Sequence, residues 1–316
     1  MTQFFAVEAA QLALVLALAP LFTGFVRKVK ALLAERRGPP VLQPYRELLR
    51  LFGKEAVLAE NASWLFRAAP YLMFVLTWIA AAMIPTFVRG LPFGWSADLI
   101  AIIALIGSAR FFLALAGMDV GTVFGGIGSS REVMIASLAE PAMLMIVFTL
   151  ALIVGSTQLS AIAAFSASAE SGFRISLGLA LVALIMVAIA ENGRVPVDNP
   201  ATHLELTMVH EAMVLEYSAR HLALIELASM LKLLLYASLI ACVFLPWGLH
   251  DAGEGSVACV EGLMSYGGKL CVLGFLLAMF ETSIAKMRVF RVPEFLGAAL
   301  MLGLLAALLR FVSRSF

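Results

Sequence analysis

Six charged residues lie inside long apolar stretches of this chain, and a seventh, Glu191, ends another such stretch. A charge near the centre of a bilayer costs about 2.5–3.5 kcal/mol on insertion scales, so these residues are candidates for function. Glu8 lies near the start of its stretch and fits a snorkelling side chain. Buried carboxylates around a lysine are typical of a proton relay, and structural ion pairs are the alternative. The predicted relay consists of Arg110, Glu140, Glu191, Glu226, Lys232 and Glu281.

The expected depth of these residues predicts one ion pair. Arg110 and Glu140 each lie about eight residues from the inner end of a span, which is ~12 Å at ~1.5 Å per residue. We therefore predict that they pair. Glu226 and Lys232 are six positions apart, on different helix faces, so neither is the other's main partner. Pro141 is expected to break its helix locally and to admit water.

Eight apolar segments must position these residues. The chain of 316 residues is 62% hydrophobic, with a mean hydropathy of +0.98, which lies outside the range of soluble domains. A segment of ~20 apolar residues can cross a bilayer, and must then be helical. We predict an all-α, polytopic membrane protein of about eight helices, forming one membrane domain over residues 1–316. The expected spans are 3–26, 68–88, 97–118, 133–155, 174–192, 221–247, 266–285 and 294–312.

The basic residues predict the orientation. Loops on one face hold fifteen Lys and Arg residues, and the opposite face holds five, among which we count Lys269. By the positive-inside bias, both termini lie outside. The first segment has no basic n-region and no cleavage site, so we expect a retained helix rather than a signal peptide. The expected cytoplasmic loops are 27–67, 119–132, 191–220 and 286–293.

The first inner loop contains a short helical pattern. Gly38, Pro39 and Pro40 cannot continue a helix, so the chain turns there. The following residues predict a basic amphipathic helix in the membrane interface. A plain juxtamembrane anchor is the alternative. The apolar face would carry Tyr45, Leu48, Leu49 and Phe52, and the basic face Arg46, Arg50 and Lys54.

The second inner loop is rich in glycine. No strand precedes it and no G-K-[ST] follows, which argues against a phosphate cradle. We expect a tightly folded loop that lies against a partner. Ser129 and Glu132 are spaced as a capping box that would open the fourth span. The glycines are Gly121, Gly125, Gly126 and Gly128.

The third inner loop, residues 191–221, is the most polar stretch. It lacks H-E-x-x-H and G-x-S-x-G, so neither a zinc site nor a hydrolase site is indicated. The three cysteines form no C-x-x-C pair, so iron–sulfur ligation by this chain lacks support. A dense acidic loop fits partner docking or proton delivery better. Its titratable residues include Glu191, Asp198, His203, Glu205, His210, Glu211, Glu216 and His221.

Five blocks carry a resemblance to a known family. They are ERRGPPVLQPYRELLRLFGKE at 35–55, GSSREVMIASLAEP at 128–141, AENGRVPVDNPATHLEL at 190–206, LEYS at 215–218 and ETSIAKMRV at 281–289. Over essentially the whole chain they resemble the eight-helix subunit shared by respiratory complex I (its subunit 1 family) and membrane-bound group 4 NiFe hydrogenases, including formate hydrogenlyase. The fourth inner loop is similar to the hydrogenase branch.

The resemblance implies a non-catalytic subunit of an oxidoreductase complex in a bacterial inner membrane. It implies no cofactor in this chain, with iron–sulfur clusters and possibly a NiFe centre in partner subunits. Those partners are hydrogenase-like large and small subunits and a ferredoxin-like iron–sulfur subunit on the cytoplasmic side, and antiporter-like subunits in the bilayer; nucleic acid is not a partner. Glu140, Glu191 and Glu281 match acids of the family's proton path. Docking is expected at Arg36, Arg37, Gln43, Arg46, Arg131, Glu132, Asp198, His203, Glu205, His210, Glu211, Glu216, Tyr217 and Arg288.

The third loop departs from the family pattern P-F-D-x-x-E-x-E-x-E-L. Val197, Ala201 and His203 replace the phenylalanine and two glutamates. His203 remains a candidate proton carrier because the ordinary pKa of imidazole is near neutral. Two other hypotheses stay open: a quinone-reactive complex I relative, with the first and third inner loops lining a quinone chamber, and an autonomous ion transporter. The transporter hypothesis predicts an inverted repeat, which the sequence does not show.

Overall fold

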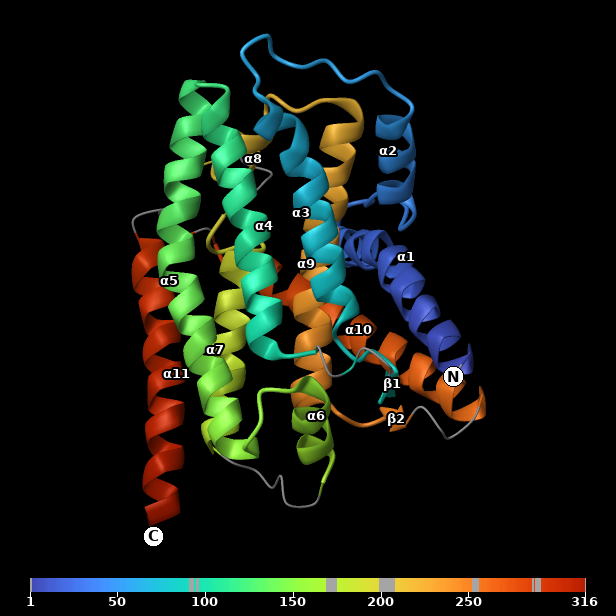
Figure 1. The fold of residues 1–316 in the computed structure, drawn as a ribbon, viewed down its shortest axis with the longest axis vertical. Helices are drawn as coiled ribbons and strands as arrows, with labels where there is room; N and C mark the ends of the chain where they lie inside the picture. Colours follow the sequence, from blue (N-terminus) through green and yellow to red (C-terminus); the bar gives the residue numbers. More distant parts are fainter. Residues whose placement is uncertain are drawn as a thin grey trace.

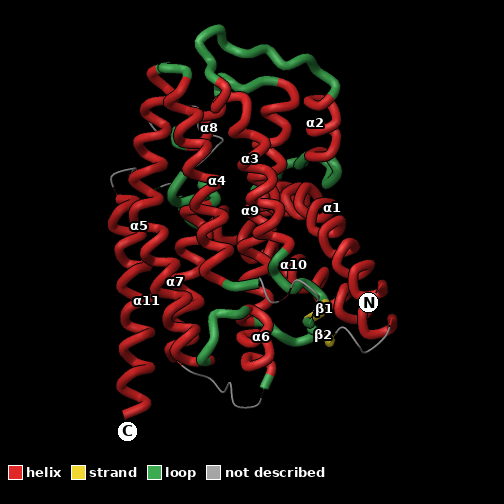
Figure 2. The backbone as a smooth tube through the Cα atoms, in the orientation of Figure 1, coloured by secondary structure: helices red, strands yellow, loops and turns green. Residues whose placement is uncertain are grey.

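The computed structural model describes residues 2–90, 94, 97–168, 175–198, 208–251, 256–285, 287 and 291–315. Within these ranges the chain is almost entirely helical (Figures 1 and 2). Two strands of two residues each, β1 (Val88–Arg89) and β2 (His250–Asp251), pair in parallel. The helices are α1 (Thr2–Leu33), α2 (Gln43–Phe52), α3 (Trp64–Ala82), α4 (Leu99–Asp119), α5 (Val123–Val154), α6 (Leu159–Ala167), α7 (Ile175–Glu191), α8 (His210–Val214), α9 (Ala219–Phe244), α10 (Ser256–Ser283) and α11 (Val292–Ser315).

Seven helices of the described chain are long and apolar enough to cross a membrane: α1, α3, α4, α5, α9, α10 and α11. The remaining expected span is α7, an apolar helix of 17 residues. At ~1.5 Å per residue it is about 25 Å long, near the lower limit for crossing the hydrocarbon core. The prediction of an all-α, polytopic membrane protein is confirmed. The chain ends both lie in the lower half of Figure 1.

Helix α9 lies at the centre of the bundle. It packs against α1, α2, α3, α6, α7 and α10, and most of its length is buried. A helix that is apolar on every side is expected to be buried in this way. Helix α11 packs along α5 and α7, and α1 and α10 pack on each other at a tilt to the other helices (Figure 1). The functional side chains lie where these helices meet.

The first inner loop is shorter than expected because α1 continues to Leu33. The short helix predicted after the turn is present as α2, and it packs against α1 and α9. Pro44 and Leu48 form its buried face. The Tyr45 hydroxyl donates a hydrogen bond to the backbone oxygen of Ala17, which joins α2 to α1.

The second inner loop is also shorter, because α5 begins ten positions before the expected residue 133. Thr122 is its N-cap, and the Thr122 hydroxyl accepts a hydrogen bond from the Gly125 amide at 3.2 Å. The capping box predicted at Ser129 and Glu132 is therefore wrong. The buried Ser129 hydroxyl donates instead to the backbone oxygen of Ala114, on α4, at 2.9 Å.

The glycines of this segment belong to helix packing rather than to a loop. A Cβ atom on Gly125 would overlap the backbone oxygen of Gly117, on α4. A Cβ atom on Gly128 would lie 2.9 Å from the backbone oxygen of Val209, next to α8. Close approach of α4, α5 and α8 thus compensates for the low helix propensity of glycine, about 1 kcal/mol per residue.

Pro141 does not break its helix, so that prediction is wrong. Helix α5 runs without interruption from Val123 to Val154. A proline removes one backbone hydrogen bond, and packing of α5 against its neighbours α4, α7 and α11 keeps the helix continuous. Helices α1 and α3 likewise contain Pro20 and Pro70.

Candidate functional site

Four buried charges meet around Glu191, the last residue of α7. The Glu191 carboxylate forms an ion pair with the Arg110 guanidinium, from α4, and lies 3.7 Å from Lys232 Nζ, from α9. Arg110 Nε also lies 3.4 Å from the carboxylate of Glu132, from α5. The Glu191 side chain is only 1% exposed. Two cations and two carboxylates thus balance each other where four helices converge.

The position of Glu191 at a helix end explains why it has two cationic partners. The C-terminus of a helix carries partial negative charge, which disfavours a carboxylate. Burial adds a desolvation penalty of several kcal/mol per ion, which only close opposite charges offset. Arg110 and Lys232 supply that compensation.

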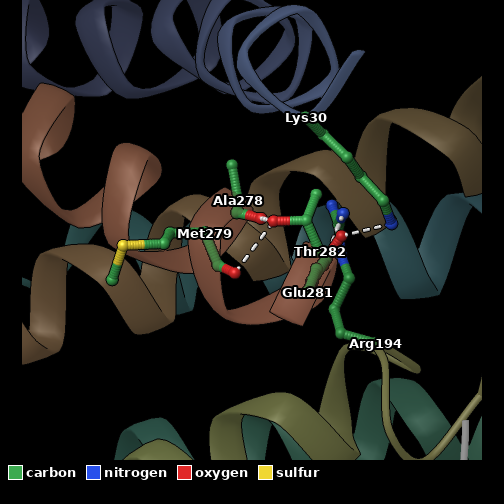
Figure 3. Close-up of polar contacts among 6 residues, drawn as sticks. All are labelled: Lys30, Arg194, Ala278, Met279, Glu281 and Thr282. Atoms are coloured by element: carbon green, nitrogen blue, oxygen red, sulfur yellow. Dashed lines mark hydrogen bonds and ion pairs between the residues drawn. The ribbon is translucent and has the colours of Figure 1, made fainter. Parts of the chain in front are cut away.

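Glu281 forms a second cluster with the same design. It lies in the last turn of α10, and its side chain is 1% exposed. Lys30 Nζ, in the last turn of α1, lies 2.7 Å from one carboxylate oxygen. Arg194 Nη1, just after α7, lies 3.2 Å from the other oxygen. Figure 3 shows both cations directed at Glu281, whereas the hydroxyl of the neighbouring Thr282 bonds to its own helix.

The two clusters line one cavity of about 460 Å³, here called the polar cavity. It lies among α1, α4, α5, α7, α8 and α9, at the end of the bundle that carries α2 and α8 (Figure 1). Glu226 and Lys232 both line it without pairing with each other, as predicted. Its charged or titratable residues are Arg27, Lys30, Arg36, Arg110, Glu132, Glu191, Arg194, Asp198, His210, Glu211, Glu226 and Lys232.

Glu140 does not pair with Arg110, so that prediction is wrong. Because α5 begins at Val123, Glu140 lies 17 positions into the helix, which is about 25 Å. Its carboxylate faces α4 at Gly107, where a Cβ atom would lie 3.2 Å from Glu140 Oε1. A gap of about 10 Å³, close to the space that one water needs, is lined by Glu140, Arg110, Glu191 and Tyr236. Glu140 therefore adjoins the Glu191 cluster without joining it.

The loop residues expected to dock a partner fall into two groups. Arg37, Arg46 and Glu216 are exposed. Others hold the chain together: Arg131 Nη1 donates to the backbone oxygen of Met208 at 2.9 Å, and Gln43 Nε2 donates to Glu47 at 3.3 Å. The residues that line the polar cavity instead are Arg36, Glu132, Asp198, His210 and Glu211.

Tyr217 is buried beneath the loop that precedes α9. Its hydroxyl donates to the backbone oxygen of Phe66 at 3.0 Å, and the two rings stack with centroids 4.0 Å apart. Burial raises the pKa of Tyr217, and the nearby charge of Asp119 raises it further. Tyr217 thus holds the loop against α3. His203, Glu205 and Arg288 lie outside the described residues.

Three cations in the interior are not predicted by the sequence. Lys30 and Arg194 fall in expected loops, because α1 is expected to end at residue 26 and because neighbouring helices cannot be read from sequence. Lys269 is expected on the outer face, but it is 6% exposed, near the middle of α10. The unexpected length of α1 and α10 would have been the only signal.

Among the residues that the structure describes, no group of three or more His, Cys, Asp or Glu side chains could hold a metal ion. The described cysteines, Cys242, Cys259 and Cys271, are free. The arrangement offers buried, mutually compensated charges beside a polar cavity. Such a set of groups can exchange protons with water in that cavity.

The sequence as a whole matches one family model, described as NADH dehydrogenase, over residues 7–312. The chain belongs to the NADH dehydrogenase family. It is similar to formate hydrogenlyase subunit 4 of Escherichia coli (strain K12), with 35% identity over 94% of each chain. Hydrogenase-4 component C of the same organism is also 35% identical, over 88% of this chain and 87% of that one.

More distant family members extend the likeness to respiratory enzymes. A membrane component of the NADH-quinone oxidoreductase of Paramagnetospirillum magneticum is 27% identical over 83% of this chain and 77% of its own length. Among solved structures, a chain of the membrane-bound sulfane sulfur reductase, an archaeal respiratory membrane complex, has a TM-score of 0.77. That alignment covers 97% of this chain and 99% of the other, at 18% identity, and shows a shared fold.

Proposed function

We propose that this chain is the membrane anchor and proton-path subunit of a complex-I-like, membrane-bound hydrogenase of the formate hydrogenlyase type. Its relatives from formate hydrogenlyase and hydrogenase-4 support the type of complex. The NiFe centre and the iron–sulfur clusters belong to hydrogenase-like and ferredoxin-like partners, which bind on the cytoplasmic face. Antiporter-like subunits adjoin the chain in the bacterial inner membrane.

The polar cavity is the observation that carries this proposal. Small-molecule pockets are mostly apolar, whereas this cavity is lined by two clusters of charges. Ionisable groups in a membrane interior mark ion and proton pathways. Protons enter from water in the cavity, reach Glu191, and pass to Glu140 across the water-sized gap. Glu281 connects the same cavity to the end of α10.

Purification of the tagged chain in a mild detergent tests the assembly. Mass spectrometry of the purified sample is expected to identify a hydrogenase-like large subunit, an iron–sulfur subunit and an antiporter-like subunit. A chain that purifies alone and monodisperse contradicts the proposal. A sample that contains only unrelated chains contradicts it equally.

Replacement of one carboxylate tests the proton path. Glu140→Gln is expected to abolish proton translocation in inverted vesicles while the complex keeps its electron transfer activity. Glu261→Gln is the control, because this carboxylate is exposed and lies 3.8 Å from His250, far from α5 in sequence. Equal proton translocation in the wild type, Glu140→Gln and Glu281→Gln would show that neither carboxylate carries protons.

A quinone site is the second candidate function, favoured by the volume of the polar cavity. About 460 Å³ lies within the range of small-molecule pockets, roughly 300–1,000 Å³. Its dense charge fits a neutral quinone ring poorly, which is why we rank this function second. Quinone reductase activity of the purified complex, lost in Met230→Trp at the cavity wall, would reverse the ranking.

A further inference from the structure

A second cavity, of about 430 Å³, lies among α1, α7, α9 and α10, and is here called the apolar cavity. Its size is within the range of small-molecule sites. No step of the proposed proton path uses it. Its walls are almost entirely hydrocarbon, from side chains such as Phe22, Ile189, Leu233, Ile240, Leu277 and Phe280.

The apolar cavity faces the bilayer on one side. Ile185, Leu276 and Met279 belong to its lining and are exposed on the surface of α7 and α10. Ala188 and Ala237 lie deeper, and both are buried. Small side chains at these two positions leave the space that larger residues would fill. The opening admits an extended hydrocarbon chain from the side.

One end of the apolar cavity is polar. Asn192, Arg194 and Ser283 line that end, next to the Glu281 cluster. Lys30 and Arg194 share a single carboxylate, so this cluster carries a surplus positive charge (Figure 3). Arg194 uses Nη1 for Glu281, and a guanidinium has five N–H donors, so it keeps donors for an anion.

We propose that the apolar cavity binds one acyl chain of an anionic phospholipid, with the lipid phosphate beside Arg194 and Asn192. The surplus charge distinguishes this ligand from a quinone, whose neutral head gains little from it. The cavity is also too small for a transmembrane helix of a partner, since a helix with its side chains is about 10–12 Å wide. The proposal stands independently of the proton path.

The lipid would also stabilise the Glu281 cluster. Asn192 and Arg194 line both cavities, so they form the wall between the polar and the apolar space. A lipid phosphate on one side of Arg194 and Glu281 on the other hold the guanidinium in place. Loss of the lipid is therefore expected to loosen the end of α10.

Lipid retained by the purified complex is the first test. After extensive detergent washing, the wild-type complex is expected to retain a stoichiometric amount of phosphatidylglycerol, quantified by mass spectrometry. Ala188→Phe and Ala237→Phe fill the cavity and are expected to abolish this retention. Val272→Phe, on the exposed surface of α10, is the control and retains the lipid. Equal retention in all four samples, no retained phospholipid, or a retained quinone overturns the proposal.

Thermal unfolding decides the question even if the filled variants fold poorly. Phosphatidylglycerol added to the delipidated complex is expected to raise the Tm, and phosphatidylcholine with the same acyl chains is not. The rise is expected to disappear in Arg194→Gln and to persist in Arg46→Gln, at an exposed arginine of α2. An equal rise with both lipids, or in both variants, contradicts a phosphate site at Arg194.

Discussion

Two buried carboxylates at helix C-termini, Glu191 and Glu281, each lie within 4 Å of two cations. A carboxylate in that position opposes the helix dipole and is desolvated, so it persists only with such partners. The same pairing makes each carboxylate a structural as well as a functional residue. A substitution therefore leaves two cations without their charge partner.

Glu191→Gln is expected to destabilise the protein by roughly 3–5 kcal/mol, the cost of breaking a buried ion pair. Arg110 and Lys232 would remain in the interior without its charge. Thermal unfolding in detergent, followed by tryptophan fluorescence, measures the effect. Glu47→Gln is the control, because its pair with Arg27 is 37–44% exposed and such pairs contribute about 0–1 kcal/mol. Similar Tm values for both variants would refute the structural role of Glu191.

Lys269→Met is expected to preserve or raise the Tm. Lys269 is buried in α10, and within the described part of the chain no carboxylate lies within ion-pair distance of it. A buried charge without a partner costs several kcal/mol, and methionine removes that cost at a similar side-chain length. Lys232→Met, which removes a partner of Glu191, is expected to lower the Tm. A lower Tm in Lys269→Met would reveal a stabilising partner of this lysine.

At the level of elements, the sequence predicts what depends on hydropathy and misses what depends on neighbours. The eight apolar segments and α2 follow from runs and spacing of side chains. The early start of α5 does not, because its glycines favour a helix only when α4 and α8 lie against them. The partners of Arg110 were equally hidden, since a helix apolar on all sides gives no signal about which face meets which neighbour.

Gly125→Ala is expected to destabilise the protein by about 1–3 kcal/mol, the usual cost of overpacking. Its Cβ atom would overlap a backbone oxygen of α4, which cannot rotate away. Gly126→Ala is the matched control in the same helical turn. No atom lies within 4 Å of the position that its Cβ atom would take, so alanine is expected to stabilise α5 by up to about 1 kcal/mol. Urea or thermal unfolding compares the two, and equal effects would rule out close packing of α4 and α5 at this point.

At the level of the whole molecule, the number of crossings decides where the chain ends lie. Eight crossings place both termini on one side, whereas the seven long helices alone would place them on opposite sides. The short helix α7 is therefore the deciding element. It is packed between α5, α9 and α11, and the two chain ends lie in the same half of the bundle (Figure 1). This arrangement favours a crossing by α7.

Reporter fusions test the crossing and the orientation together. Fused after residue 316, alkaline phosphatase is expected to be active and green fluorescent protein dark, because the C-terminus is predicted to lie outside. Inserted between α2 and α3, at residues 54–62, the same reporters are expected to behave in the opposite way. A fluorescent C-terminal fusion together with a fluorescent insertion would leave α7 on one side of the membrane. If both reporters reverse at both sites, the crossing stands and the orientation is inverted, which would place the polar cavity, and with it the redox partners, on the outer face.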